Sequence, residues 1–119
     1  PLSLTGIIDY TGNLTIARNT VGEVYNQIIT DLTSAAELLP VINGVYADRY
    51  SVLALLSRVY LQIGNYAQAR DIADDVIQNS GHVLVASYPD AFNNDTNSTE
   101  DLFLIQVPSQ GIALFGLNG

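Results

Sequence analysis

Apolar residues recur every three or four positions through the middle of this 119-residue chain, with polar residues between them. This period places apolar side chains on one face of a helix. The first such stretch covers residues 20–39, where Thr20 and Glu23 have the spacing of a capping box and Pro40 ends the pattern. Its buried stripe is expected to contain Val21, Val24, Tyr25, Ile28, Leu32, Ala35, Ala36 and Leu39.

Residues 48–63 and 65–79 are predicted to form a helical hairpin. Asp48 is a suitable N-cap, and Gly64 suits the left-handed residue that ends a helix. The link is only about two residues long, which requires antiparallel helices. The stripe of the first helix is wide enough for burial on two sides, which predicts a central position. It contains Tyr50, Val52, Leu53, Ala54, Leu55, Leu56, Val59, Tyr60, Leu61 and Ile63, and the second helix contributes Tyr66, Ala69, Ile72, Ala73, Val76 and Ile77.

The flanking segments have a different character. Residues 1–19 are expected to be irregular and residues 82–119 to contain loops and short strands. Residues 82–85 are an extended candidate, 89–101 a polar loop, and 102–107 a buried strand that ends at Pro108. The predicted fold class is therefore mainly α, with short extended segments near the C-terminus, in a single domain or fragment. A start at Pro1 and the absence of Met favour a piece of a longer protein.

The charge and the residue types limit the chemistry. Twelve carboxylates and four arginines give a net charge of −8. Nucleic-acid binding relies on basic side chains, so the scattered Arg18, Arg49, Arg58 and Arg70 argue against that role. No cysteine is present, which excludes disulfides, thiol nucleophiles and cysteine-ligated metals. No apolar run has the length of a membrane span, and no signal peptide is evident.

The hairpin resembles a tetratricopeptide (TPR) unit. Leu53, Leu56, Ser57 and Tyr60 precede the turn at Gly64, and Tyr66, Ala69, Ala73 and Val76 follow it. In such a unit, small residues let the two helix axes approach and large residues fill the space around the turn. The match is partial, because Leu53 stands where the usual Trp would be and Ala73 replaces the usual aromatic residue.

A longer resemblance is to the SusD/RagB family. Its Tyr-x-x-Ile-x-x-Asp-Leu-x-x-Ala helix ending in Leu-Leu-Pro corresponds to Tyr25, Ile28, Asp31, Leu32, Ala35, Leu38, Leu39 and Pro40. Its Leu-x-Arg-Val-Tyr-Leu helix corresponds to Leu56, Arg58, Val59, Tyr60 and Leu61, and its acidic segment followed by an apolar strand corresponds to residues 100–107. Together these pieces cover roughly residues 15–107 in the family's order.

The resemblance implies a non-catalytic part of a surface-exposed, lipid-anchored outer-membrane protein. Such proteins bind glycans or other nutrients and work with a SusC-like TonB-dependent transporter, and the TPR-like helices serve as their scaffold. No cofactor is implied. The alternative is a generic TPR-like module that binds a peptide along its concave face. The sequence upstream of Pro1 would discriminate between the two roles, since the first requires a lipobox cysteine there.

No catalytic or metal site is expected. His82 is the only histidine and is expected to be an ordinary helix-terminus residue. Asp71, Asp74 and Asp75 are predicted to lie on the solvated face of their helix. The oxygen-rich residues 90–101 lack the Gly and Glu spacing of an EF-hand.

Aromatic residues are the remaining candidates for a ligand site. Tyr46 follows the Asn43-Gly44 turn signal and is the one residue proposed for ligand contact. Tyr88 and Phe92 are expected to pack beneath the polar loop instead.

Overall fold

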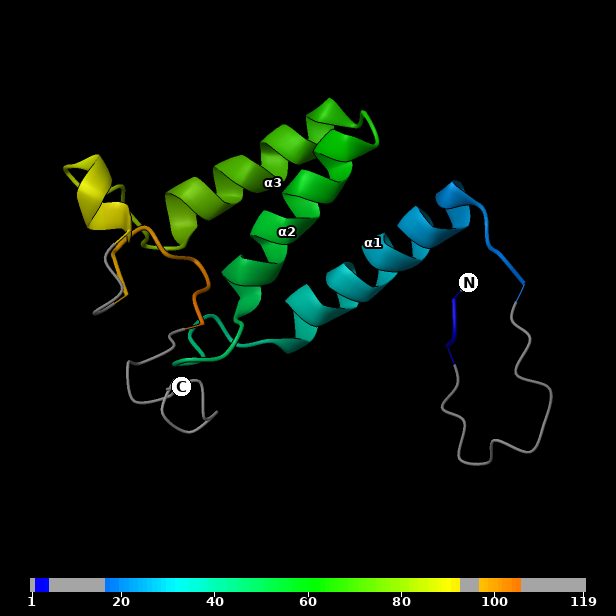
Figure 1. The fold of residues 1–119 in the computed structure, drawn as a ribbon, viewed down its shortest axis with the longest axis horizontal. Helices are drawn as coiled ribbons and strands as arrows, with labels where there is room; N and C mark the ends of the chain where they lie inside the picture. Colours follow the sequence, from blue (N-terminus) through cyan, green and yellow to red (C-terminus); the bar gives the residue numbers. More distant parts are fainter. Residues whose placement is uncertain (1, 5–16, 93–96, 106–119) are drawn as a thin grey trace, which may run out of the picture.

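The computed structural model describes residues 2–4, 17–92 and 97–105. Within these ranges the protein is helical, as predicted: α1 (Val21–Leu38), α2 (Arg49–Gln62) and α3 (Tyr66–Asn79) are followed by one short 3-10 helix, η1 (Tyr88–Phe92). The three α-helices lie side by side in one layer, with α2 in the middle (Figure 1). None of the described helices combines the length and the apolar character needed to cross a membrane.

Helix α1 begins with the predicted capping box. The Glu23 amide donates to the Thr20 hydroxyl over 3.2 Å, and the Thr20 amide donates to the Glu23 carboxylate over 2.7 Å. These two bonds satisfy backbone N–H groups that have no partner inside the helix. At the other end Leu39 is extended, with φ −78° and ψ 141°, as expected of a residue before proline.

The hairpin of α2 and α3 also has the predicted ends. Asp48 caps α2 by accepting the Ser51 amide over 2.8 Å, and Gly64 adopts a φ of +81° in the turn. Beyond the turn, the two helices approach closely where the buried Ala69 faces α2. There the Ser57 hydroxyl donates to the Ala69 carbonyl oxygen over 2.8 Å. A small residue and a short polar contact therefore set the helix crossing.

The core lies where α2 meets its two neighbours. Its buried residues are Tyr50, Leu53 and Leu56 of α2 and Val76 of α3. Half-buried side chains pack around them: Ile29, Leu32, Ala36, Tyr60, Ile72 and Leu102. The predicted central position of α2 is thus confirmed, and both outer helices contribute mainly residues that keep some contact with solvent.

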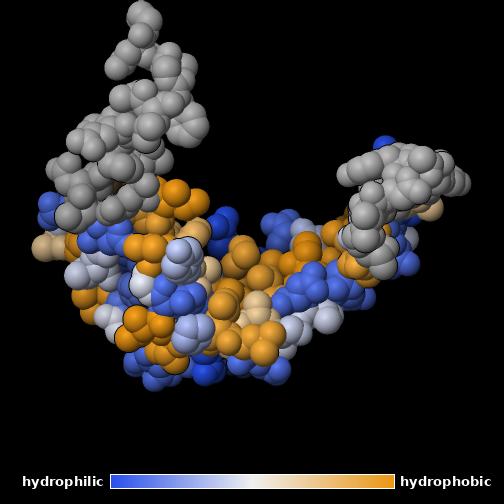
Figure 2. Space-filling model, turned by 90° about the horizontal axis from the view of Figure 1, so that it is seen from below, coloured by the Kyte–Doolittle hydropathy of each residue, from blue (hydrophilic) through white to orange (hydrophobic). Residues whose placement is uncertain are grey.

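Several residues predicted to be buried are exposed. They are Val21, Leu55, Leu61, Ile63, Tyr66 and Ile77. The helical period places Tyr66 and Ile77 on the apolar side of α3. However, α3 contacts only one other α-helix in the described chain, so part of this side stays uncovered. A one-layer arrangement covers a narrower stripe than the pattern predicts. Apolar side chains consequently gather on the surface across the middle of the face drawn in Figure 2.

The segment after α3 differs most from the prediction. Residues 102–105 form no strand, and Phe103 and Ile105 are more than half exposed, so the predicted buried strand is wrong for these residues; residues 106 and 107 lie outside the described part. The Val83 amide donates to the Thr99 carbonyl oxygen over 3.1 Å, but no described residue forms a sheet. The predicted polar loop, residues 89–101, begins within η1, and residues 93–96 of this loop also lie outside the described ranges.

Candidate functional site

A hollow of about 340 Å³ lies where three segments distant in sequence come together. Its walls are the connection from α1 to α2, the end of α3 and the segment 97–104. Pro40 ends α1 and Asn43-Gly44 turns the chain, with Gly44 at φ +65° and the Tyr46 amide donating to the Asn43 carbonyl oxygen. These local signals place residues 41–46 along one rim of the hollow.

Hydrogen bonds hold the opposite wall in place. The Ser51 hydroxyl donates to the Leu102 carbonyl oxygen over 2.6 Å, which ties the start of α2 to the distant segment. The Asp48 carboxylate, 2.7 Å from the same hydroxyl, competes for its single proton. Further along, the Ser98 amide donates to the Asp101 carboxylate over 2.7 Å. The wall is therefore fixed chiefly by polar contacts, with Leu102 packed against the core.

One polar atom in this wall has no partner among the described residues. The hydroxyl oxygen of Ser98 is buried and makes no hydrogen bond to any residue that the structure describes. Buried polar atoms are nearly always hydrogen-bonded to protein or to water, so this hydroxyl has bonding capacity that the described residues leave unused. His82, Asp48 and Asp101 also line the hollow and supply further donors and acceptors.

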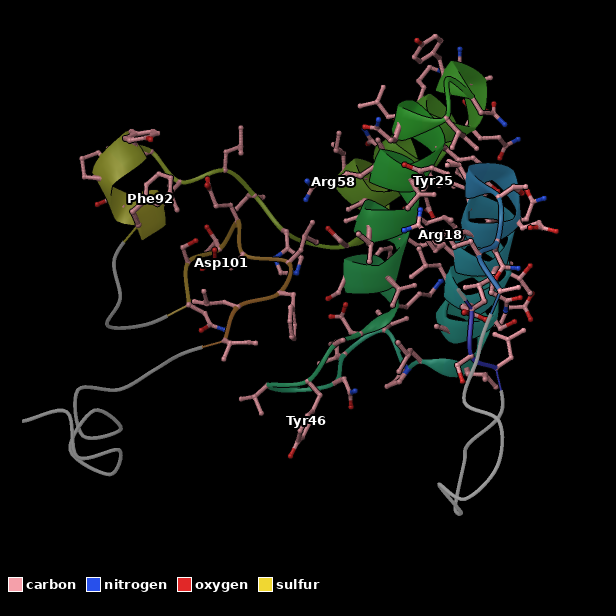
Figure 3. The ribbon with its side chains drawn as sticks, turned by 45° about the vertical axis from the view of Figure 1, so that its right-hand side comes forward. Arg18, Tyr25, Tyr46, Arg58, Phe92 and Asp101 are labelled. Carbon is pink, nitrogen blue, oxygen red and sulfur yellow. The ribbon has the colours of Figure 1, made fainter. Side chains whose placement is uncertain are left out.

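Tyr46 stands at the rim of this hollow. Its side chain is 73% exposed and projects from the turn, away from the helices (Figure 3). This position agrees with the prediction that Tyr46, which follows the Asn43-Gly44 turn, is exposed. An aromatic face beside several hydrogen-bonding groups is a common composition for a site that binds a ring-shaped polar ligand.

Tyr88 and Phe92 do not pack beneath the loop, contrary to the prediction. They are 80% and 65% exposed, and their ring centroids lie 4.8 Å apart with the planes tilted by 50°. The pair sits on η1, which is held at its start by the Ser87 hydroxyl donating to Asp90 over 2.7 Å. Phe92 lies far from Tyr46 in Figure 3, with Asp101 between them, so the three aromatic residues do not form one surface.

The other candidates for chemistry remain structural. His82 is half-buried, and its Nδ1 atom lies 3.2 Å from the Thr99 carbonyl oxygen. Asp71 pairs with Arg70, and Asp75 accepts from the Asn79 side chain over 2.7 Å. In the part of the chain that the structure describes, no three acidic or histidine side chains converge as a metal site would require.

The sequence did not indicate the far wall of the hollow. Ser98, Asp101 and Leu102 look like parts of a polar loop and a strand, and no local signal joins them to residues 41–48. Their position depends on the bond from Ser51 to Leu102, which spans 51 residues. A periodic pattern carries no information on such a contact.

The fold is a helical scaffold with a hollow between its loops. A family model for SusD-like proteins, described as "Starch-binding associating with outer membrane", matches residues 6–61. This match supports the assignment of the chain to the SusD/RagB-like family. No curated protein and no solved structure matches the chain.

Proposed function

We propose that this chain is the helical part of a glycan-binding protein that is associated with the outer membrane. The family match supports this role, and the matched residues include Tyr46 and the connection that forms one rim of the hollow. In this proposal the chain holds the sugar without breaking bonds, as the description of the matching family, starch-binding, supports. In the intact protein a lipid anchor retains it at the cell surface.

The hollow is the observation that carries this proposal. A sugar ring presents C–H groups on its faces and hydroxyls around its edge. The Tyr46 ring suits the faces, and the Asp101 carboxylate, of which one oxygen already accepts from the Ser98 amide, suits the hydroxyls. The bound glycan then passes to a SusC-like TonB-dependent transporter, the partner that the family resemblance implies.

Titration with a linear α-glucan tests the proposal. Maltoheptaose is added to the 119-residue chain and to its Tyr46→Ala variant, with binding measured by isothermal titration calorimetry. Removal of the ring is expected to raise the Kd about tenfold, a typical effect for one aromatic contact. Tyr66→Ala is the matched control, because Tyr66 is 68% exposed but lies at the hairpin turn and does not line the hollow.

The variants separate the outcomes clearly. Weaker binding in Tyr46→Ala with unchanged binding in Tyr66→Ala supports a glycan site at this rim. Equal affinities in all three proteins, or no binding of the glucan by the unmodified chain, contradicts the proposal that these residues hold the sugar. Circular dichroism of each variant confirms that the helices are intact.

A further inference from the structure

A second hollow lies on the other side of the α3 end, and its lining is mostly apolar. This groove encloses about 540 Å³ between α3 and residues 82–84 and 100–102. Ile77 is 70% exposed and Leu84 is 87% exposed, while Val76 forms part of the groove from the buried core. Large apolar side chains gathered around a concavity are uncommon on the surface of a monomer and mark sites of interaction.

The polar groups at the groove already have partners. The Ser80 hydroxyl accepts from the His82 amide over 3.1 Å, and one Glu100 carboxylate oxygen accepts from the Val85 amide over 3.0 Å. The His82 ring lies against the Thr99 carbonyl oxygen. A sugar needs several hydrogen-bonding groups that are free to orient it. This groove offers chiefly C–H surface, so it suits apolar side chains of a protein.

The charges around the groove are negative. Glu100 lines it, and Asp74, which is exposed but not part of the lining, lies one helical turn before Ile77 on α3. None of the four arginines lines it, and Arg70 is paired with Asp71. A second copy of this chain would bring a further net charge of −8 to the interface, which opposes self-association through this face.

We propose that the groove docks a polypeptide segment that carries apolar side chains flanked by Lys or Arg. The apolar side chains occupy the space beside Ile77 and Leu84, and the basic groups face Asp74 and Glu100. This inference goes beyond glycan binding, and it concerns a different hollow from the one at Tyr46.

Two designed peptides test the inference. Both are amphipathic 14-residue helices with the same leucine stripe; the polar face is lysine in one and glutamate in the other. Fluorescence anisotropy measures their binding to the 119-residue chain, to the double variant Ile77→Ser/Leu84→Ser, and to Val21→Ser. Val21 is a matched control, because it is 72% exposed on α1 and outside the groove.

The lysine peptide is expected to bind the unmodified chain, more weakly as salt rises, and about tenfold less tightly to the double variant. Val21→Ser should bind as the unmodified chain does. Equal affinity of the double variant, or equal affinity for the glutamate peptide, overturns the proposal. Self-association that depends on Ile77 and Leu84, seen by analytical ultracentrifugation, also overturns it in favour of a second copy. The maltoheptaose titration involves neither residue, so the two proposals fail independently.

Discussion

At the scale of single residues, the start of α1 shows how one carboxylate links local geometry to pH. Glu23 accepts hydrogen bonds from the Thr20 amide and from the Thr20 hydroxyl. These bonds stabilise the charged form and hold the pKa of Glu23 below its ordinary value. The same hydrogen bonds from Thr20 therefore stabilise the folded helix when the Glu23 carboxylate is ionised.

We expect Glu23→Gln to reduce the acid sensitivity of α1. Because the pKa is lowered on folding, the contribution of Glu23 is complete at pH values well above 4.5, its ordinary pKa, and disappears as the pH falls through the lower folded value. Thermal unfolding followed by circular dichroism between pH 7 and pH 3 measures the effect. Glu37→Gln, near the opposite end of α1, is the control. A loss of stability on acidification that is the same in the Glu23 variant and in the unmodified chain would contradict the assignment.

At the scale of elements, the turn between α2 and α3 depends on one left-handed residue. Gly64 has a φ of +81°, and a Cβ added there would meet no atom within 4 Å. The effect of Gly64→Ala is therefore purely one of backbone conformation, and we expect it to lower the free energy of unfolding by about 1–2 kcal/mol. Urea denaturation measures the change.

Gly22→Ala is the opposite case and serves as the control. Gly22 lies within α1, and its added Cβ also meets nothing. Alanine favours a helix over glycine by up to about 1 kcal/mol, so this variant should be more stable than the unmodified chain. If both alanine variants changed stability in the same direction, the left-handed conformation at Gly64 would not explain the result.

The elements are also where the sequence was most informative. Thr20 with Glu23, Asp48, Gly64 and Pro40 act through their nearest neighbours in the chain, so local signals suffice to predict the ends of the helices. Periodicity likewise identifies α2 as the central helix. It cannot show how many neighbours a helix has, and for that reason it predicts burial at Tyr66 and Ile77, both of which are exposed.

At the scale of the whole molecule, the candidate site is only half predictable. The Asn43-Gly44 turn indicates that Tyr46 is exposed, because turn chemistry is local. The opposite wall comes from residues 97–104, which the bonds to Val83, Val85 and Ser51 bring into place. An apolar run such as Leu102–Ile105 is read as a buried strand when taken alone. In the structure only Leu102 of these residues reaches the core.

The bond between the Ser51 hydroxyl and the Leu102 carbonyl oxygen joins the helical scaffold to this wall. In Ser51→Ala that bond is lost together with the contacts of the hydroxyl to the Asp48 amide and carboxylate, while the backbone amide of residue 51 still caps α2 against Asp48. A hydrogen bond of this kind contributes about 1 kcal/mol. The equilibrium constant for separation of residues 97–104 from α2 should therefore be about five times larger in the variant than in the unmodified chain. Amide hydrogen exchange at Val83 and Val85, whose N–H groups bond to Thr99 and Glu100, reports this opening.

Ser57→Ala provides the matched control, because its hydroxyl bonds to Ala69 within the hairpin and does not reach the wall. Ser57→Ala should speed amide exchange in α3 and leave the exchange rates of the Val83 and Val85 amides as they are in the unmodified chain. Ser51→Ala should do the reverse, and it should also weaken maltoheptaose binding, since Ser98 and Asp101 lose their fixed position across from Tyr46. Faster exchange at Val83 and Val85 with unaltered glucan affinity would show that the wall does not contact the sugar, and the ligand would then have to lie on the Tyr46 rim alone.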